Sequence, residues 1–228
     1  MHVAAKHVRQ RAWLFHLKEP TNCLSHFAAG VVFVFALQYV MRESAYDLWR
    51  FSWLSFYAAS FVFMYFASAL YHGLVLTQKS QSRVLQRIDH AGIFLAIAGS
   101  NAPLCMITLY DSCGPTVMLF VTGAASAGIT YSIARGRLPR RFLAPIYVTM
   151  ALPIAVGTPE LVSRLPLAAE LLLFGGCALY VVAAVVFATR RPNPNPPYFG
   201  FHELFHVLIM AASALHFAFM ALYLLPAN

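Results

Sequence analysis

The chain has 228 residues, of which 60% are hydrophobic and 11% are charged, and its formal net charge is +8. A soluble domain usually carries about 25% charged residues, so this composition excludes an ordinary soluble globular protein. The basic residues stand almost entirely between apolar stretches, which favours anionic lipid headgroups over nucleic acid as their partner.

The N-terminal segment, residues 1–18, is basic and mixed, and we predict a surface-lying helix or a loose arm there. Residues 19–228 then form one domain in which long apolar runs alternate with short polar loops. Each run is long enough to cross a hydrocarbon core about 30 Å thick, the fifth only marginally, so the pattern predicts an all-α bundle of seven transmembrane helices. The predicted spans cover residues 22–39, 51–76, 88–110, 115–133, 142–157, 167–188 and 200–225.

The basic residues predict the orientation of this bundle. Thirteen of them fall in the N-terminal segment and in the loops that lie on the same side of the membrane, and three fall on the other side. By the positive-inside rule, the N-terminus is predicted to be cytoplasmic and the C-terminus to be outside. The three outer residues are Arg42, Arg50 and Arg164; the inner ones are Lys6, Arg9, Arg11, Lys18, Lys79, Arg83, Arg87, Arg135, Arg137, Arg140, Arg141, Arg190 and Arg191.

The four cysteines are scattered and form no CxxC pair. This spacing indicates neither a disulfide framework nor a thiolate metal site. A bridge between Cys105 and Cys113 is conceivable but is not favoured.

Several ionisable or polar side chains lie where the predicted helices enter or leave the bilayer. Such groups cost a few kcal/mol each within a span, so their presence needs a cause. In the predicted topology, helices 1, 3 and 7 begin on the cytoplasmic side and helix 2 ends there, which puts these side chains at one membrane level. The group consists of Glu19, His26, Ser68, His72, Asp89, His90, His202, Glu203 and His206.

Three of these histidines have the spacing of a metal site. His202 and His206 are four residues apart and project from one helical face, and His72 comes from another helix. Three imidazoles with an open fourth position are the arrangement of catalytic zinc, so we predict one Zn²⁺ held by this set. Asp89 is expected to hydrogen-bond a ligand or the catalytic water as an acid–base group.

Alternative interpretations apply to the neighbouring residues. Residues 202–206 spell HExxH, which makes Glu203 an alternative base to Asp89, although the motif alone is weak. Single histidines within membranes often only hydrogen-bond another helix, and this interpretation is favoured for His26 and His90. His216 lies about 15 Å deeper than His206, too far for the same ion, so we assign it to packing or a polar contact.

Three groups of residues form a recognisable set of motifs. They are Glu19-x-x-Asn22-x-x-Ser25-His26; Ser68-Ala69-Leu70-Tyr71-His72 with Asp89-His90 and Ala98-Gly99-Ser100-x-x-Pro103; and Gly200-Phe201-His202-Glu203-Leu204-Phe205-His206 with Leu215-His216-Phe217. On these residues the chain resembles, over essentially its whole length, the hemolysin III family, the bacterial branch of the progestin and adipoQ receptor group.

The resemblance implies a seven-helix fold with a cytoplasmic N-terminus, the reverse of G-protein-coupled receptors. It also implies zinc on His72, His202 and His206, with Asp89 near the catalytic water and Ser68 matching a serine of the family's site. The wider superfamily includes ceramide-hydrolysing enzymes, which suggests hydrolysis of a lipid amide.

Three functions remain open at this stage. The leading hypothesis is a zinc-dependent hydrolase of the membrane that acts on a lipid amide or ester. The second is a non-enzymatic regulator or receptor-like protein in which zinc only joins helices. The third, a pore-forming cytolysin, has little support, because a lytic protein usually needs a soluble exported form.

Overall fold

A computed structural model describes residues 17–76, 78–135, 146–147, 149–150, 153–196 and 199–225. Within these ranges the fold is helical, and the β-type pairing is a single bridge between Asn195 and Phe199, before the last helix. Two of the helices given below end in short π-helical turns. Leu104–Thr108 extends the helix that ends at Pro103, and Met220–Leu224 extends the helix that ends at Phe219. The helices are α2 (Pro20–Glu43), α3 (Leu48–Gly73), α4 (Lys79–Pro103), α5 (Gly114–Arg135), α7 (Pro153–Arg164), α8 (Leu167–Thr189) and α9 (Phe201–Phe219).

Six of these helices, all except α7, are long and apolar enough to cross a membrane. They confirm six of the predicted spans and the all-α class. The fifth predicted span, residues 142–157, lies partly outside the described residues, and its last residues form the start of α7. Most of the predicted N-terminal arm also lies outside the described residues. Helix α7 has 12 residues, about 18 Å of helix, which is too short for a hydrocarbon core about 30 Å thick.

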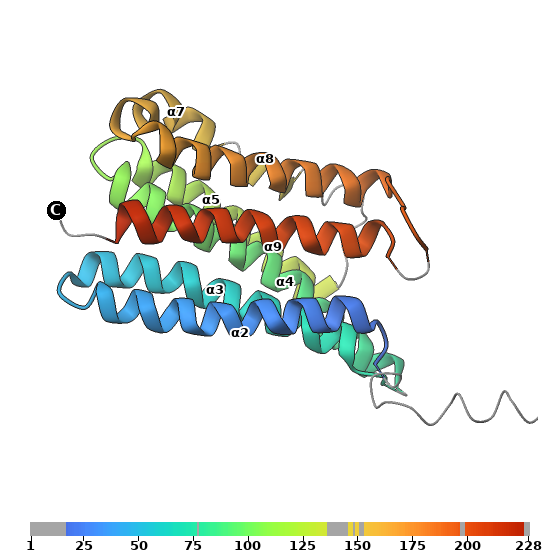
Figure 1. Ribbon diagram of the computed structural model, residues 1–228. Helices are drawn as coiled ribbons and strands as arrows, with labels where there is room; N and C mark the ends of the chain where they lie inside the picture. The colour runs from blue at the N-terminus through green and yellow to red at the C-terminus, as the bar shows by residue number, and fades with distance from the viewer. Residues whose placement is uncertain are drawn as a thin grey trace, which may run out of the picture.

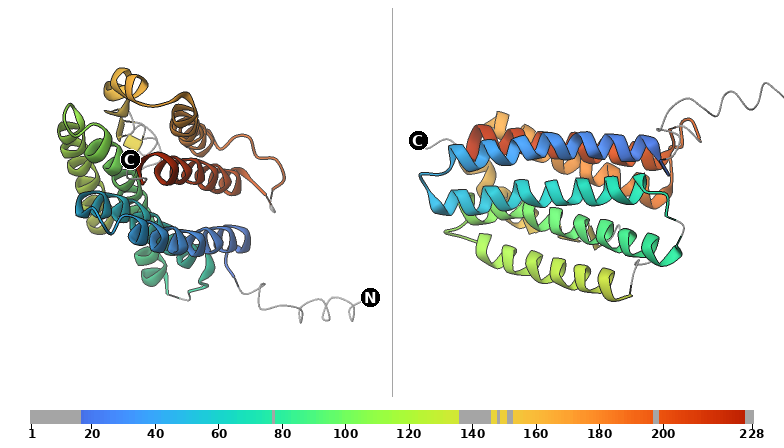
Figure 2. Two further views of the ribbon diagram at one scale, coloured as in Figure 1. Left: turned by 60° about the vertical axis from the view of Figure 1, so that its left-hand side comes forward. Right: turned by 90° about the horizontal axis from the view of Figure 1, so that it is seen from below.

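The long helices run roughly along a common axis (Figure 1). Seen nearer to end-on, α2, α3, α4 and α5 follow one another along an arc, and α9 lies between α2 and α8 (Figure 2). Helices α2 and α9 therefore begin, and α3 ends, at the same end of the bundle, on the right in Figure 1. This arrangement brings residues near 20, 72 and 202 together although they lie far apart in sequence.

Local sequence sets where these helices begin and bend. Asp47 caps α3, because its Oδ1 accepts hydrogen bonds from the backbone amides of Trp49 at 2.9 Å and Arg50 at 3.2 Å. Pro20 occupies the first turn of α2, where a missing N–H costs nothing. Pro103 ends the regular part of α4, and the π-helical turn follows it directly.

In the core beside the site, the buried side chains of α3 are mostly aromatic, and many of those of α4 are small. Tyr57, Phe61 and Tyr65 of α3 are fully buried in the main hydrophobic cluster. On α4, Gly92 lets the two helices approach closely, because a Cβ atom there would lie 3.1 Å from the backbone of Met64. Close packing of α3 and α4 holds the side chains at their ends beside one another.

All four cysteines are free thiols, so the conceivable Cys105–Cys113 bridge is not formed.

Candidate metal centre

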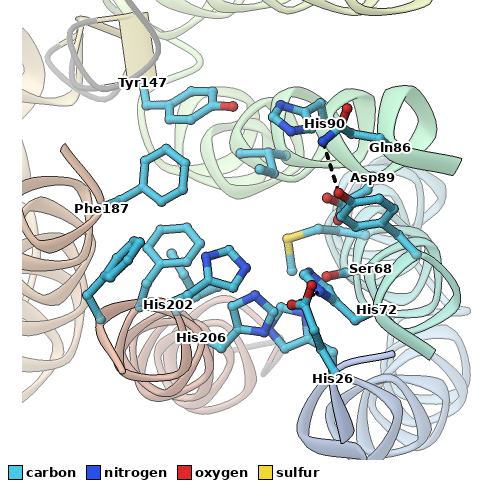
Figure 3. Close-up of a pocket in the computed structure, with 17 residues that line it drawn as sticks. His26, Ser68, His72, Gln86, Asp89, His90, Tyr147, Phe187, His202 and His206 are labelled. Atoms are coloured by element: carbon cyan, nitrogen blue, oxygen red, sulfur yellow. Dashed lines mark hydrogen bonds and ion pairs between the residues drawn. The ribbon is translucent and has the colours of Figure 1, made fainter. Parts of the chain in front are cut away.

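Three histidines from two helices converge at one end of the bundle (Figure 3). His72 lies in the last turn of α3, and His202 and His206 lie in the first two turns of α9. The ring centroids of His72 and His202 are 5.2 Å apart, those of His72 and His206 are 5.0 Å apart, and those of His202 and His206 are 4.7 Å apart. The structure thus brings together the three residues that the spacing predicted.

The donor set fits a divalent metal ion. One nitrogen of each ring lies within 4.8 Å of the others, and His72 and His206 are buried while His202 is half-buried. Imidazole nitrogens bind zinc at about 2.0–2.1 Å, so donors around one ion lie up to about 4 Å apart, and small side-chain rotations would close the remaining difference. Nδ1 of His206 is buried and has no hydrogen-bond partner among the described residues.

Glu19 fixes the orientation of His72. The Oε2 atom of Glu19 lies 2.7 Å from Nδ1 of His72, and an ionised carboxylate can only accept, so this nitrogen carries the hydrogen. The Nε2 lone pair of His72 is therefore left for the cavity, as in metal sites where a carboxylate holds the far ring nitrogen. The hydrogen bond from His72 lowers the pKa of Glu19 to about 2, against the opposing effect of burial.

Glu203, the acidic residue of the HExxH sequence, does not line the cavity and bonds to groups at the start of α9 and on α2. Its Oε2 accepts a hydrogen bond from the backbone amide of Gly200 at 2.8 Å, and its Oε1 accepts one from Nδ2 of Asn22 at 2.9 Å. The first bond caps the start of α9, and the second joins α9 to α2. Glu203 thus occupies a structural position at the helix end, whereas Asp89 faces the cavity.

A cavity of about 240 Å³ adjoins the histidines. Asp89 of α4 and Ser68 of α3 lie on its wall, within hydrogen-bonding reach of one another, and both are buried. In Figure 3 they stand on the right, near His72, with the rings of α9 below and to the left. Much of the remaining wall is apolar or aromatic, and includes Met64, Ile93, Tyr147, Phe187, Phe205 and Ile209.

The other predicted histidines have three different surroundings. His26 stacks on His206 rather than hydrogen-bonding a neighbouring helix, and both of its ring nitrogens are buried without partners. His90 is buried in the wall of the cavity. His216 has the expected polar contact, since its Nε2 lies 3.1 Å from the carbonyl oxygen of Leu173.

Glu19 is among the polar residues expected near the site, but the sequence predicted no partner for it and no site role for Asn22. The signal for both was the motif that precedes the first span, where an acidic residue and an amide stand one helical turn apart. Such a pair shares a helix face. Its partners on α3 and α9 could be identified only in three dimensions.

Comparison with known proteins adds family relationships to this geometry. The model of the family described as "Haemolysin-III related" matches residues 15–217. The chain is 26% identical over 217 residues to "Hemolysin-3" of Bacillus cereus, covering 93% of this chain and 94% of that protein. It is also 26% identical over 219 residues to the "Hemolysin-3 homolog" of Bacillus subtilis (strain 168), covering 92% of this chain and 96% of that protein. The resemblance identified from the motifs is confirmed.

Proposed function

The chain belongs to the haemolysin-III related family of membrane proteins, and we propose that it is a zinc-dependent hydrolase that cleaves an amide or ester bond of a membrane lipid. The single observation that carries this proposal is the placement of three converging imidazoles and a buried carboxylic acid around one cavity. Catalytic zinc sites combine such a ligand set with an open position and a nearby acid–base group.

The proposed metal ligands are His72, His202 and His206. When bound, zinc polarises a carbonyl group and lowers the pKa of a water molecule towards 7. Asp89 accepts a proton from the attacking water molecule while the oxygen of that water bonds to the carbonyl carbon of the substrate. Asp89 then returns the proton to the leaving nitrogen or oxygen as the carbon–nitrogen or carbon–oxygen bond breaks. Ser68, beside Asp89, orients its carboxyl group.

The rest of the cavity supports an apolar substrate. Phe187 lies across the cavity from Asp89 (Figure 3). Phe205 also lines the cavity, and its ring centroid is 5.0 Å from that of Phe187. An acyl chain would gain about 25 cal/mol for each Å² of apolar surface buried against such a wall. A lipid that approaches from the bilayer can therefore leave its chain in the apolar part while its carbonyl group reaches the histidines.

We also propose that this end of the bundle faces the cytoplasm of a bacterial inner membrane. Described basic residues that lie on this side, such as Lys18, Arg83 and Arg190, outnumber those on the other side, in agreement with the positive-inside rule. Anionic headgroups would then gather around the site. In a cysteine-free variant, Lys79→Cys should react with an impermeant maleimide only after the cells are permeabilised. Arg42→Cys should react before permeabilisation.

The hydrolase proposal is tested with detergent-purified, zinc-loaded protein and a panel of acyl amides and esters that carry ceramide-like, N-acyl amine and glycerolipid headgroups. We expect release of fatty acid from at least one class, loss of release after chelation, and recovery after zinc is added back. If the zinc-loaded protein cleaves none of the panel, the hydrolase proposal is wrong. If chelation melts the bundle and no cleavage is seen, the ion only joins helices.

A further inference from the structure

We propose that Asn22, Glu19 and Glu203 form a hydrogen-bonded clasp that sets the distance between His72 and the two histidines of α9. In this role Glu203 is a positioning residue, and it is not the base that its place in an HExxH sequence would suggest. The inference rests on the metal site of the proposed function and concerns how that site is held together.

Asn22 is the centre of the clasp. It lies in the first turn of α2, is 1% exposed, and has one NH₂ group whose two hydrogens reach two carboxylates. Its Nδ2 donates to Oε2 of Glu19 at 3.0 Å and to Oε1 of Glu203 at 2.9 Å. Since Oε2 of Glu19 also bonds Nδ1 of His72 at 2.7 Å, four side chains form a continuous series from α3 through α2 to α9.

The main chain strengthens both ends of this series. At one end, the backbone amide of Glu19 donates to the carbonyl oxygen of His72 at 2.9 Å, and that of Lys18 donates to Gly73 at 3.3 Å. At the other end, the second oxygen of Glu203 holds the backbone amide of Gly200, which precedes α9. A shift of α9 relative to α3 would therefore have to break this series.

The charges explain why an amide is needed at the centre. Two carboxylates that accept from one NH₂ group repel each other, and an aspartate in place of Asn22 would add a third negative charge and remove both donors. Oδ1 of Asn22 is buried with no partner, so the site tolerates an unpaired acceptor in order to use the two donors. Lys18, whose Nζ lies 3.5 Å from Oε1 of Glu19, and the N-terminus of α9 partly offset the negative charge.

The location of Glu203 argues against a role as the base. It is not among the residues that line the cavity, although His202 and Phe205 on either side of it are. Both of its oxygens are already engaged by Gly200 and Asn22. A general base must lie within hydrogen-bond reach of the proton that it removes, directly or through one water. Asp89 meets this condition at the cavity wall, and Glu203 does not.

The test compares three variants, Asn22→Ala, Asn22→Asp and Glu203→Gln, with wild type and with a matched control. The control, Glu43→Gln, makes the same chemical change at the far end of α2, where Oε1 of Glu43 lies 3.6 Å from Nε of Arg42. Zinc affinity is measured in detergent by competition with a chromophoric chelator, the visible spectrum of the Co²⁺ form reports ligand geometry, and the melting temperature of the metal-free protein reports folding.

We expect zinc affinity to fall about 10- to 100-fold for Asn22→Ala and Glu203→Gln, as is usual when a residue that supports a metal ligand is removed. Asn22→Asp should lose more than Asn22→Ala because it adds repulsion, and the Co²⁺ spectrum should change in all three. The Glu43→Gln variant should stay within about twofold of wild type. Gln at 203 cannot accept both hydrogen bonds, since its NH₂ group only donates.

Two results would overturn the clasp. One is zinc affinity within about twofold of wild type for both Asn22→Ala and Glu203→Gln. The other is a Glu203→Gln variant with unchanged affinity and abolished turnover, which would make Glu203 a catalytic residue. A wild-type protein that binds no divalent metal would instead contradict the proposed function itself, and the clasp with it. Should Asn22→Asp not fold, the other two variants still decide the question.

Discussion

His26 and His206 stack face to face, with ring centroids 3.7 Å apart and an angle of 18° between the ring planes. His26 belongs to α2 and His206 to α9, so the stack joins two helices beside the proposed metal ion. The edge of the Tyr65 ring packs on His26 from α3, with centroids 5.1 Å apart. His26 therefore contacts His206, a proposed ligand, through its ring face, and both ring nitrogens of His26 lack a hydrogen-bond partner among the described residues.

Replacing His26 by Phe tests this role. The phenyl ring keeps the stacking contact and removes two buried nitrogens that have no partner, a change that is often neutral or stabilising. We expect the zinc content to stay at the wild-type level and the melting temperature to be equal or higher. The control is His206→Phe, which should lose the metal. Loss of zinc in the His26→Phe protein would make His26 a ligand and refute this assignment.

Asp89→Asn should separate chemistry from metal binding. The amide keeps the size of the side chain but cannot take up a proton, so we expect turnover of the lipid substrate to fall about 10²- to 10⁴-fold, with zinc content unchanged. Asp111→Asn is the matched control, because Asp111 is exposed and pairs with Arg164 in a loop outside the cavity. Equal turnover by Asp89→Asn and wild type would exclude Asp89 as the acid–base group, and loss of zinc would make it a ligand.

The close contact of α3 and α4 gives a stability prediction. A Cβ atom at Gly99 would overlap the side chain of Ser60, whose hydroxyl donates to the carbonyl oxygen of Tyr57 at 2.7 Å. Gly99→Ala should lower the free energy of unfolding by about 1–3 kcal/mol, measured by denaturation in mixed micelles, and Ser60→Ala should restore part of it. Gly123→Ala should be neutral or stabilising, because a Cβ atom there would meet no described atom within 4 Å beyond its chain neighbours and the backbone of its own helix. Equal stability of the two alanine variants would contradict this packing.

Tyr65 makes a hydrogen bond whose direction can be deduced. The Ser213 hydroxyl donates to the carbonyl oxygen of Met210 at 2.9 Å, so the Tyr65 hydroxyl must be the donor in its 2.6 Å contact with Ser213 Oγ. Tyr65→Phe removes this bond and should cost about 0.6 kcal/mol and at most about 1.7 kcal/mol, the average and the maximum measured for hydrogen bonds between helices of a membrane protein. Tyr39→Phe, at an exposed tyrosine, should change the unfolding free energy by less. No difference between the two variants would show that the buried bond contributes nothing.

The fold could be read largely from hydropathy, because a span must be apolar over about 20 residues whatever its neighbours are. Helix ends were less predictable. Helix α2 begins at Pro20, before the predicted start at residue 22, since proline fits the first turn and no apolar residue marks it. Helix α4 begins at Lys79, well before the predicted start at residue 88, because its polar first turns extend beyond the apolar run.

Within the site, the convergence of His72, His202 and His206 was predictable because two of them share a helix face and the topology sets the depth of the third. The partners of these residues were not. The bond between Glu19 and His72 depends on how the segment before α2 lies against the end of α3, 53 residues later. Glu203 could have turned toward the cavity or away from it, and its hydrogen bonds to Gly200 and to Asn22 on the neighbouring helix decide between the two.

The proposed metal site is tested most directly by the metal content of the purified protein, measured by elemental analysis in wild type and in the His72→Ala, His202→Ala and His206→Ala variants. We expect about one zinc per wild-type chain and almost none in each variant, with all four proteins eluting as folded species in detergent. A folded wild type that carries no divalent metal, or a His206→Ala variant that retains the full amount, would contradict the proposed metal site.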